Sequence, residues 1–509
     1  MKWKFKHSLG ILLTLTLLVG LFAGCSQGDT PSNSGTSAND RDSIVIATLG
    51  ETPSVHPYDH NATAGSYMNL LTYDTLFRND VNQNPQPHLV ESYENIDDST
   101  WQFTPKQGIL FHNGEEMKAQ DVEASIEWAM TFAEVMPSHE KMLGIDVVDD
   151  YTFTLHTDGP YALLITNLAS HGNAILPKSL IDQGHDFGEE PIGSGPYKLV
   201  EWNRGDSLVF EANEDYFNGA PAIKSMTWRI IPEGSGRTIA LEAGEVDVVI
   251  EVESMDYERL KETEGITVAE YDSTSITWLY LNNEVPGLDN QNVRHAINSA
   301  INKESVVEVA LNGLGTPAIG QLPSNLAGYS EENADAYDVE RAREFLAASG
   351  VDPSTLSFPI ITSNDTRRRA GEVIQANLQE IGINVELESM DLATYLSATS
   401  EGDYTAAIGG WTSNVLLDCL IGVYHSSGIN ASNKTRISDP ELDALIDEAG
   451  VTLDEEERNA ILEQACARAN ELCPAAPLFL ETGLRAYNSD LKGVEVSQSG
   501  TIYFDRVSW

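Results

Sequence analysis

Residues 370–388 read AGEVIQANLQEIGINVELE, and this stretch indicates the class of the fold. Five apolar residues recur in it at the spacing of one helix face: Ala370, Val373, Ile374, Leu378 and Ile381. Gly382 follows, a residue type that commonly ends a helix. Apolar and polar residues then alternate over residues 383–388, which is the period of a half-buried strand. A helix, a glycine and a strand in this order predict an α/β unit.

The same two periods recur elsewhere in the chain. Residues 44–47, 101–103 and 151–155 predict short strands. Between the last two, Asp121 is the expected N-cap of a helix, and a further helix is expected to begin after Asp439, where proline follows. Helices and strands mixed over this length predict α/β lobes.

The N-terminus has the layout of a secretory signal. Three lysines precede an uncharged, largely apolar stretch over residues 9–24. The stretch is shorter than the roughly 20 residues of a membrane-spanning helix, so residues 1–24 are expected to be a signal peptide. The small residues directly before Cys25 resemble a bacterial lipobox, which implies lipid attachment at Cys25. The alternative is an ordinary secreted protein that is cut near this point.

Composition limits what the rest of the chain does. Residues 26–39 contain hardly an apolar residue, so residues 25–42 are expected to form a flexible tether. The formal net charge is −48, or about −51 without the three signal lysines. Such an acidic chain is not expected to bind nucleic acid, because phosphate contacts need clustered Lys and Arg. A preference for cationic ligands is compatible with this charge.

The cysteines do not form a disulfide framework. Beyond Cys25 the chain has Cys419, Cys466 and Cys473, an odd number without metal-type spacing. If Cys466 and Cys473 share one helix, two turns set them about 10 Å apart, which is too far for a disulfide. One bridge is an open alternative, and buried free thiols are the simpler expectation.

A series of motifs resembles one protein family in order and spacing from residue 43 to the end. The quoted motifs are PHLVESY at 87–93, GILFHNGE at 108–115, AQDV at 119–122, GSGPYKL at 193–199, NEDYF at 213–217, ALEAGEVD at 240–247, VRHAI at 293–297 and FLAASG at 345–350. Together they resemble the peptide and nickel-binding family, family 5, of bacterial ABC-transporter solute-binding proteins. The glycines at 193 and 195 lack a dinucleotide or phosphate-loop pattern, so they are expected to let the chain cross between subdomains instead.

The resemblance implies an α/β, two-lobed periplasmic-binding-protein-like fold with an inserted subdomain and a ligand cleft between the lobes. The implied ranges are 43–82, 189–282 and 486–509 for lobe I, 83–188 for the inserted subdomain, and 283–485 for lobe II. A ligand shifts such a fold toward closure by binding the closed state more tightly. We therefore expect neither a catalytic group nor a cofactor.

The resemblance also implies ligand contacts on both lobes. In lobe I they come from the loop after the first strand, here Ser54, Asn61 and Thr63. In lobe II, Arg368 stands in an Arg-rich helix start where a guanidinium can bind a peptide carboxylate, although a solvated basic face is an equal alternative.

The stretch after Trp411 departs from the family pattern. Residues 404–411 predict a strand that leads into a long loop, with Trp411 as a flat apolar wall or a core residue. Peptide-binding relatives carry an Asp just after this Trp, which pairs with the ligand ammonium. Here Asn414 stands near that place and Asp418 is the nearest carboxylate. Asp418 takes the role if the loop is re-registered; otherwise the ligand lacks a free amino terminus.

These observations predict a lipid-anchored, extracytoplasmic, monomeric binding protein that captures short peptides for ABC permease and ATPase subunits. One alternative is a nickel chelate, with His425 beyond Trp411 as a ligand, or an opine or oligosaccharide. A secreted hydrolase is a second, although neither a Gly-x-Ser-x-Gly elbow nor a His-Glu-x-x-His motif is present. A sensing or adhesion lipoprotein without an importer is the third.

Overall fold

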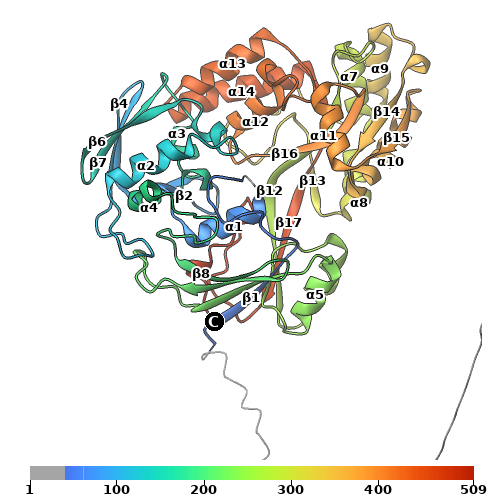
Figure 1. Cartoon of the computed structure of the whole chain (residues 1–509). Helices are drawn as coiled ribbons and strands as arrows, with labels where there is room; N and C mark the ends of the chain where they lie inside the picture. Colours follow the sequence, from blue (N-terminus) through green and yellow to red (C-terminus); the bar gives the residue numbers. More distant parts are fainter. Residues whose placement is uncertain (1–40, 61) are drawn as a thin grey trace, which may run out of the picture. The chain divides into compact units, whose positions relative to one another are not determined.

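Two long strands, β12 (Ile266–Leu281) and β17 (Ala475–Asn488), pair antiparallel along almost their whole length and lie side by side in Figure 1. The computed structural model describes residues 41–60 and 62–509. The predicted signal peptide and nearly all of the tether lie outside the described residues. Within the described residues, the structure contains no helix with both the length and the apolar character needed to cross a membrane.

One mixed sheet of eleven strands contains these two strands at its centre. Its order is β15-β14-β16-β12-β17-β11-β1-β10-β9-β8, and β13 pairs with β17 beside this path. We call the part around β8 to β11 and β1 lobe I, and the part around β13 to β16 lobe II. The other strands of the sheet are β1 (Ser43–Thr48), β8 (Tyr197–Asn203), β9 (Ser207–Ala212), β10 (Ser225–Ile230), β11 (Val248–Val249), β13 (Gly315–Pro317), β14 (Ser357–Thr362), β15 (Asn384–Ser389) and β16 (Ala406–Thr412).

A β-bulge interrupts the pairing of β12 with β17 where the sheet passes from one lobe to the other. The register shifts between Asp272 and Ile276. Before the bulge, β17 pairs on its other side with β11 of lobe I, and after it β12 pairs with β16 of lobe II. A bulge increases the local bend and twist of a strand pair, so the continuous sheet bends where the two lobes join.

Both faces of the lobe II sheet are covered by helices, which confirms the predicted α/β class. Ile276, Trp278 and Tyr280 of β12 belong to one buried cluster, and Leu279 and Leu281 belong to another on the opposite face. The covering helices are α7 (Gln291–Ala300), α8 (Lys303–Leu311), α9 (Val339–Ser349), α10 (Asp365–Glu380), α11 (Leu392–Glu401), α12 (Leu416–Tyr424), α13 (Pro440–Val451) and α14 (Glu455–Leu472).

Local sequence patterns in lobe II are confirmed in detail. Helix α10 is followed by Gly382 in the left-handed region, at φ 86°, and then by strand β15. Asp439 caps α13, because its side chain accepts the backbone N–H of Leu442. Cys419, Cys466 and Cys473 are all buried free thiols, as the simpler expectation had it.

A separate four-stranded sheet forms the inserted subdomain, at the upper left of Figure 1. Its order is β4-β5-β7-β6, and its helices pack one face into an apolar core of its own. The elements are β4 (Val90–Asp97), β5 (Thr100–Pro105), α2 (Ala119–Ala129), β6 (Met142–Asp149), β7 (Thr152–Thr157), α3 (Leu164–Asn167) and α4 (Lys178–Gln183). The remaining elements of lobe I are α1 (Thr63–Thr72), β2 (Phe77–Asn79), β3 (Pro85–Pro87), α5 (Gly234–Glu242) and α6 (Tyr257–Lys261).

The predicted N-cap at Asp121 is wrong by one turn. Helix α2 begins at Ala119 after Lys118, and Asp121 is its third residue. The Asp121 carboxylate accepts the backbone N–H of Lys118 at 2.8 Å and that of Lys178 at 2.7 Å. It therefore acts as the reciprocal half of a capping box and also fixes the start of α4.

The Gly193-Ser194-Gly195 turn packs directly against the end of α1. Gly195 donates its N–H to the carbonyl of Thr72 at 3.0 Å, and the Ser194 hydroxyl donates to Asp74 at 2.9 Å. A Cβ on Gly195 would lie 2.6 Å from the carbonyl oxygen of Leu71. The glycines are therefore required by close backbone contact within lobe I.

We expect Gly195→Ala to destabilise the protein by about 1–3 kcal/mol, because backbone atoms at the end of α1 must move to admit the methyl group. Urea unfolding followed by tryptophan fluorescence measures this loss. Gly50→Ala is the matched control, since a Cβ at Gly50 meets nothing within 4 Å. Equal midpoints for the two variants would contradict the packing argument.

Candidate functional site

A cleft of about 520 Å³ lies between the two lobes, in the size range of small-molecule sites. Lobe II contributes the end of β16 and the start of α12, and the rest comes from lobe I and the inserted subdomain. The lining residues are Ser66, Tyr67, Leu70, Thr75, Arg78, Asn79, Gln83, Leu163, Thr166, Asn167, Ala169, Ser170, His171, Thr412, Ser413, Asn414, Val415, Asp418, Ser499, Thr501 and Tyr503.

The cleft is bounded at both ends by contacts between the lobes. On the hinge side, Thr274 in the bulge of β12 donates its hydroxyl to the side chain of Asn414 at 3.3 Å. Away from the hinge, Ala162 of the inserted subdomain donates its N–H to the carbonyl of Gly450 at 3.1 Å. Leu163 also packs against the lobe II core. The structure therefore shows the two walls in contact around the cleft.

The lobe II wall is a strand end followed at once by a helix, so the predicted long loop after Trp411 is wrong. Strand β16 ends at Thr412, and α12 begins at Leu416. Between them the Ser413 hydroxyl accepts the N–H of Val415 at 3.2 Å, which closes a short turn. The helix forms because the apolar residues after this turn recur at helical spacing into the lobe II core.

Asp418 lies in the first turn of α12 with its side chain exposed to the cleft. Desolvation by the surrounding walls raises the pKa of the Asp418 carboxyl above 3.8, and polar groups of Ser413 and Trp411 offset part of this effect. Across the cleft, burial together with the nearby Glu140 and Asp418 raises the pKa of Tyr161 to about 12. A carboxylate held in such surroundings favours a cationic partner.

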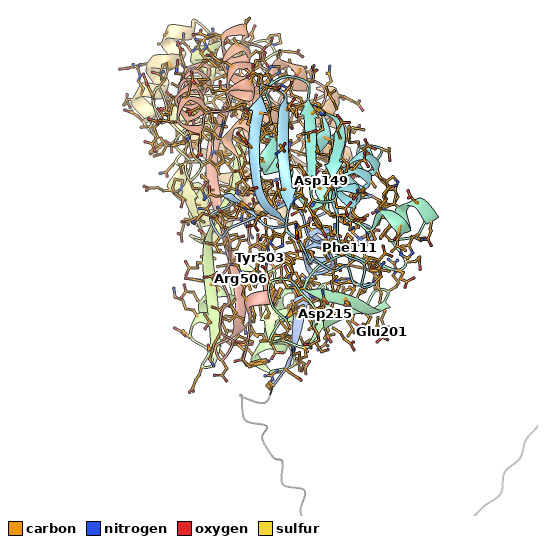
Figure 2. The ribbon with its side chains drawn as sticks, turned by 90° about the vertical axis from the view of Figure 1, so that its left-hand side faces the viewer. Phe111, Asp149, Glu201, Asp215, Tyr503 and Arg506 are labelled. Atoms are coloured by element: carbon orange, nitrogen blue, oxygen red, sulfur yellow. The ribbon has the colours of Figure 1, made fainter. Side chains whose placement is uncertain are left out.

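The lobe I wall contains an arginine whose charge is already neutralised. Arg78 donates to both carboxylate oxygens of Asp505, at 3.1 and 2.6 Å. The Arg78 guanidinium also lies 4.1 Å from the centre of the Tyr503 ring. A second arginine, Arg506, lies against the same ring, and Figure 2 shows these two residues side by side. In the described chain, Asp418 is the only acidic residue that lines the cleft, and it has no ion-pair partner among these residues.

Two histidines stand together on the wall opposite lobe II, His60 from lobe I and His171 from the inserted subdomain. The rings of His60 and His171 stack at 5.7 Å, and His171 lines the cleft. The Nε2 of His171 donates to the carbonyl of His60 at 3.3 Å, while the buried ring nitrogens of His60 have no hydrogen-bond partner among the residues that the structure describes. Burial lowers the pKa of both rings, so both are neutral at neutral pH. Neutral imidazoles are common metal ligands.

The structure brings only part of the predicted lobe II site together. Asn414 and Asp418 line the cleft. Trp411 packs over Gly422 of α12 instead, where its ring would clash with any Cβ, and it supports the helix from behind. Arg368 is exposed on α10 and forms ion pairs with Asp365 and Glu372 on the same helix, outside the cleft lining.

The other predicted contacts lie elsewhere or outside the described side chains. The Ser54 hydroxyl donates to Asp59 at 3.0 Å and does not line the cleft. Thr63 is the first residue of α1, but its side chain is not described, and Asn61 and Cys25 lie outside the described residues. His425 follows α12 with Nε2 3.4 Å from Asp447, and it does not line the cleft either.

Sequence reasoning missed most of the lobe I wall. Arg78, His171 and Tyr503 come from three segments with no recognisable motif among the quoted ones. The segment 497–501, Ser-Gln-Ser-Gly-Thr, offers hydroxyl groups but carries no pattern that indicates a ligand contact. Its contribution to the cleft depends on the C-terminal segment crossing lobe I beside α1.

Two lobes joined by a strand hinge around a ligand-sized cleft define a solute-binding protein. The profile described as "Bacterial extracellular solute-binding proteins, family 5 Middle" matches residues 84–425, more than half of the chain. The chain therefore belongs to the family 5 bacterial extracellular solute-binding proteins.

Relatives agree with this assignment. The chain is 26% identical to Heme-binding protein A of Haemophilus influenzae, over 97% of this chain and 98% of that protein. It is 27% identical to the probable D,D-dipeptide-binding periplasmic protein DdpA of Escherichia coli, over 89% and 91%. The solved structure of HbpA2 from Haemophilus parasuis has the same fold, with a TM-score of 0.84, 24% identity and coverage of 92% and 99%.

Asp418 is expected to cost the ligand-free protein stability at neutral pH. The pKa of Asp418 in the folded protein lies above 3.8, its ordinary value in the unfolded chain. Between these two pKa values the folded state binds more protons than the unfolded state, so the stability falls as the pH rises through this interval. Asp418→Asn should therefore raise the thermal midpoint slightly at neutral pH, and the gain should vanish below pH 3.8. Thermal scans of both proteins across this range test the sign; an unchanged gap at all pH values would contradict it.

Proposed function

We propose that the protein is the binding component of an ABC importer and captures short peptides in the interlobe cleft. The observation that carries this proposal is that, among the described residues, Asp418 is the only carboxylate that lines the cleft and forms no ion pair, while Arg78 is already paired with Asp505. A free α-ammonium group supplies the missing positive charge. The acidic cleft and the dipeptide-binding relative support a peptide ligand over an anionic one.

Capture follows from the position of the charge on the lobe II wall. A ligand whose ammonium contacts Asp418 must also contact the lobe I wall opposite, around Tyr503 and His171. Because both walls face the same cleft only when the lobes meet, the ligand stabilises the closed state and bending at the β12 bulge opens it. Delivery then requires only reopening against the permease and its ATPase subunits.

The N-terminal segment fits this role. The proposed mature chain begins at Cys25, which carries the lipid anchor, and the tether lets the binding unit move near the membrane surface. Residues 43–82, 189–282 and 486–509 form the proposed lobe I, residues 83–188 the inserted subdomain, and residues 283–485 lobe II. We propose that the protein acts as a monomer.

A metal chelate is the second candidate ligand, and the histidine pair favours it. His171 reaches the cleft, and both ring nitrogens of His60 beside it have no partner in the described part of the chain. The heme-binding relative supports the possibility of a metal complex. A chelate with an open coordination position could be bound by His171 alone, without Asp418.

The first test is thermal unfolding of the purified protein with free, N-acetylated and C-amidated di- to hexapeptides, and with nickel in the presence and absence of histidine. A ligand at 100 times its Kd stabilises by about 2.7 kcal/mol, which shifts the midpoint measurably. Free and amidated peptides are expected to stabilise, and acetylated peptides are not. Stabilisation by acetylated and free peptides alike would overturn the role of Asp418.

For a peptide that binds, Asp418→Asn is expected to weaken the affinity at least about 30-fold, from the roughly 2–5 kcal/mol cost of losing one partner of a buried charge pair. Asp403→Asn is the control, because Asp403 is an exposed carboxylate outside the cleft. Calorimetric titration of both variants measures the difference. Binding of the nickel complex that depends on His171 and not on Asp418 would favour the chelate.

A further inference from the structure

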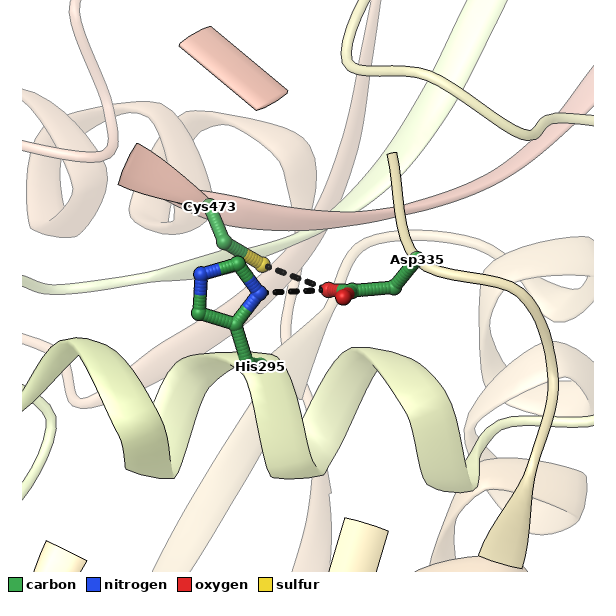
Figure 3. Close-up of side chains that lie close together, drawn as sticks. All are labelled: His295, Asp335 and Cys473. Atoms are coloured by element: carbon green, nitrogen blue, oxygen red, sulfur yellow. Dashed lines mark hydrogen bonds and ion pairs between the residues drawn. The ribbon is translucent and has the colours of Figure 1, made fainter. Parts of the chain in front are cut away.

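Three potential metal ligands meet inside lobe II, away from the cleft. His295 comes from α7, Asp335 from the connection that precedes α9, and Cys473 from the residue that follows α14. One ligand atom of each lies within 4.8 Å of the other two, and Figure 3 shows the three side chains converging. None of the three lines the interlobe cleft, so the cluster is separate from the proposed ligand site.

The histidine and the aspartate are oriented from outside the cluster. His295 directs Nδ1 to the Asp335 carboxylate at 2.7 Å and Nε2 to the carbonyl of Glu471 at 2.9 Å. The side-chain amide of Asn298 donates to the same Asp335 oxygen at 3.1 Å. A ring nitrogen that points inward while the other donates to a backbone carbonyl is the arrangement that fixes metal-binding histidines in proteins.

Cys473 is held in an unusual conformation with only weak partners for its sulfur. It is fully buried and has a φ of 45°, in the left-handed region that favours glycine or asparagine at a helix end. Its Sγ lies 3.7 Å from Asp335 and 3.6 Å from the carbonyl of Ala475. A side chain kept in a strained backbone position, aimed into a polar cluster, is a reason to look for a function there.

We propose that His295, Asp335 and Cys473 bind one zinc ion. Imidazole nitrogen, carboxylate oxygen and thiolate sulfur are the donors zinc takes in proteins, and a thiolate in the set disfavours calcium and magnesium. Asp335 is partly exposed, so it provides the route of entry and leaves room for water as the fourth ligand. On binding, the Nδ1 and Sγ protons leave to solvent, and both atoms bond to zinc. The ion cross-links α7, the Asp335 connection and the end of α14.

The test is zinc retention by the purified protein after chelator treatment, addition of zinc chloride and gel filtration. We expect one zinc per chain by elemental analysis and a higher thermal midpoint with zinc than without. Cobalt chloride in place of zinc should give a thiolate-to-metal charge-transfer absorption, which ligands in the cleft, without cysteine, cannot produce. Absence of bound zinc in the wild-type protein would overturn the proposal.

Cys473→Gly is the most informative variant, because glycine suits the left-handed conformation and the variant is expected to fold. Cys473→Gly and His295→Gln should each lower the affinity for zinc at least about 100-fold. This loss exceeds the roughly 10–100-fold loss of affinity that follows when only a hydrogen-bond partner of a metal ligand is removed. Cys466→Ala removes an equally buried thiol outside the cluster, and His171→Ala removes the cleft histidine; both should keep one zinc. Zinc binding by Cys473→Gly at wild-type affinity would show that the metal lies elsewhere and overturn the site.

Discussion

The antiparallel pairing of β12 with β17 is the constraint on which the rest of the structure depends. In the described chain, β17 pairs with β11 of lobe I and β13 of lobe II, and β12 joins β17 to β16 of lobe II. Every other strand of the sheet is attached, directly or through a neighbour, to one side of the bulge between Asp272 and Ile276. The cleft exists because one sheet continues through both lobes and bends at that point, so that β16 and the segment around Tyr503 face each other.

The charged residues of the cleft differ in whether the protein itself neutralises them. Arg78 is held by Asp505 and stacked near Tyr503, so its positive charge is satisfied within the protein. Asp418 has no cationic partner among the described residues, and burial by the walls around it raises the pKa of its carboxyl. Under the proposed function, the free energy that this desolvation costs in the empty cleft is recovered when the cationic ligand enters. The acidic surface of the whole chain adds no comparable selectivity, since solvent screens it.

Elements built from contiguous residues were predicted well. The unit of α10, Gly382 and β15 and the cap at Asp439 were predictable because helix periodicity, glycine conformation and side-chain capping are local. Two local predictions were wrong for a physical reason. Asp121 is the third residue of α2, and its carboxylate accepts the backbone N–H of Lys118, the residue that caps the helix. Residues 413–418 form a turn and a helix because their apolar side chains pack into the lobe II core. A short stretch of sequence reveals neither the core that a helix packs against nor the backbone group that a side chain caps.

The sequence by itself determined the class of the fold and the family, and it singled out Asn414 and Asp418, which line the cleft, because periodicity and ordered motifs are properties of the chain alone. Only the tertiary structure decided which side chains meet. It placed Arg368 on an outer helix face, turned Trp411 onto Gly422, and brought Arg78, His171 and Tyr503 from distant segments to one wall. It likewise assembled His295, Asp335 and Cys473 from three elements. Such contacts depend on the packing of helices against a bent sheet, and sequence separation carries no record of that packing.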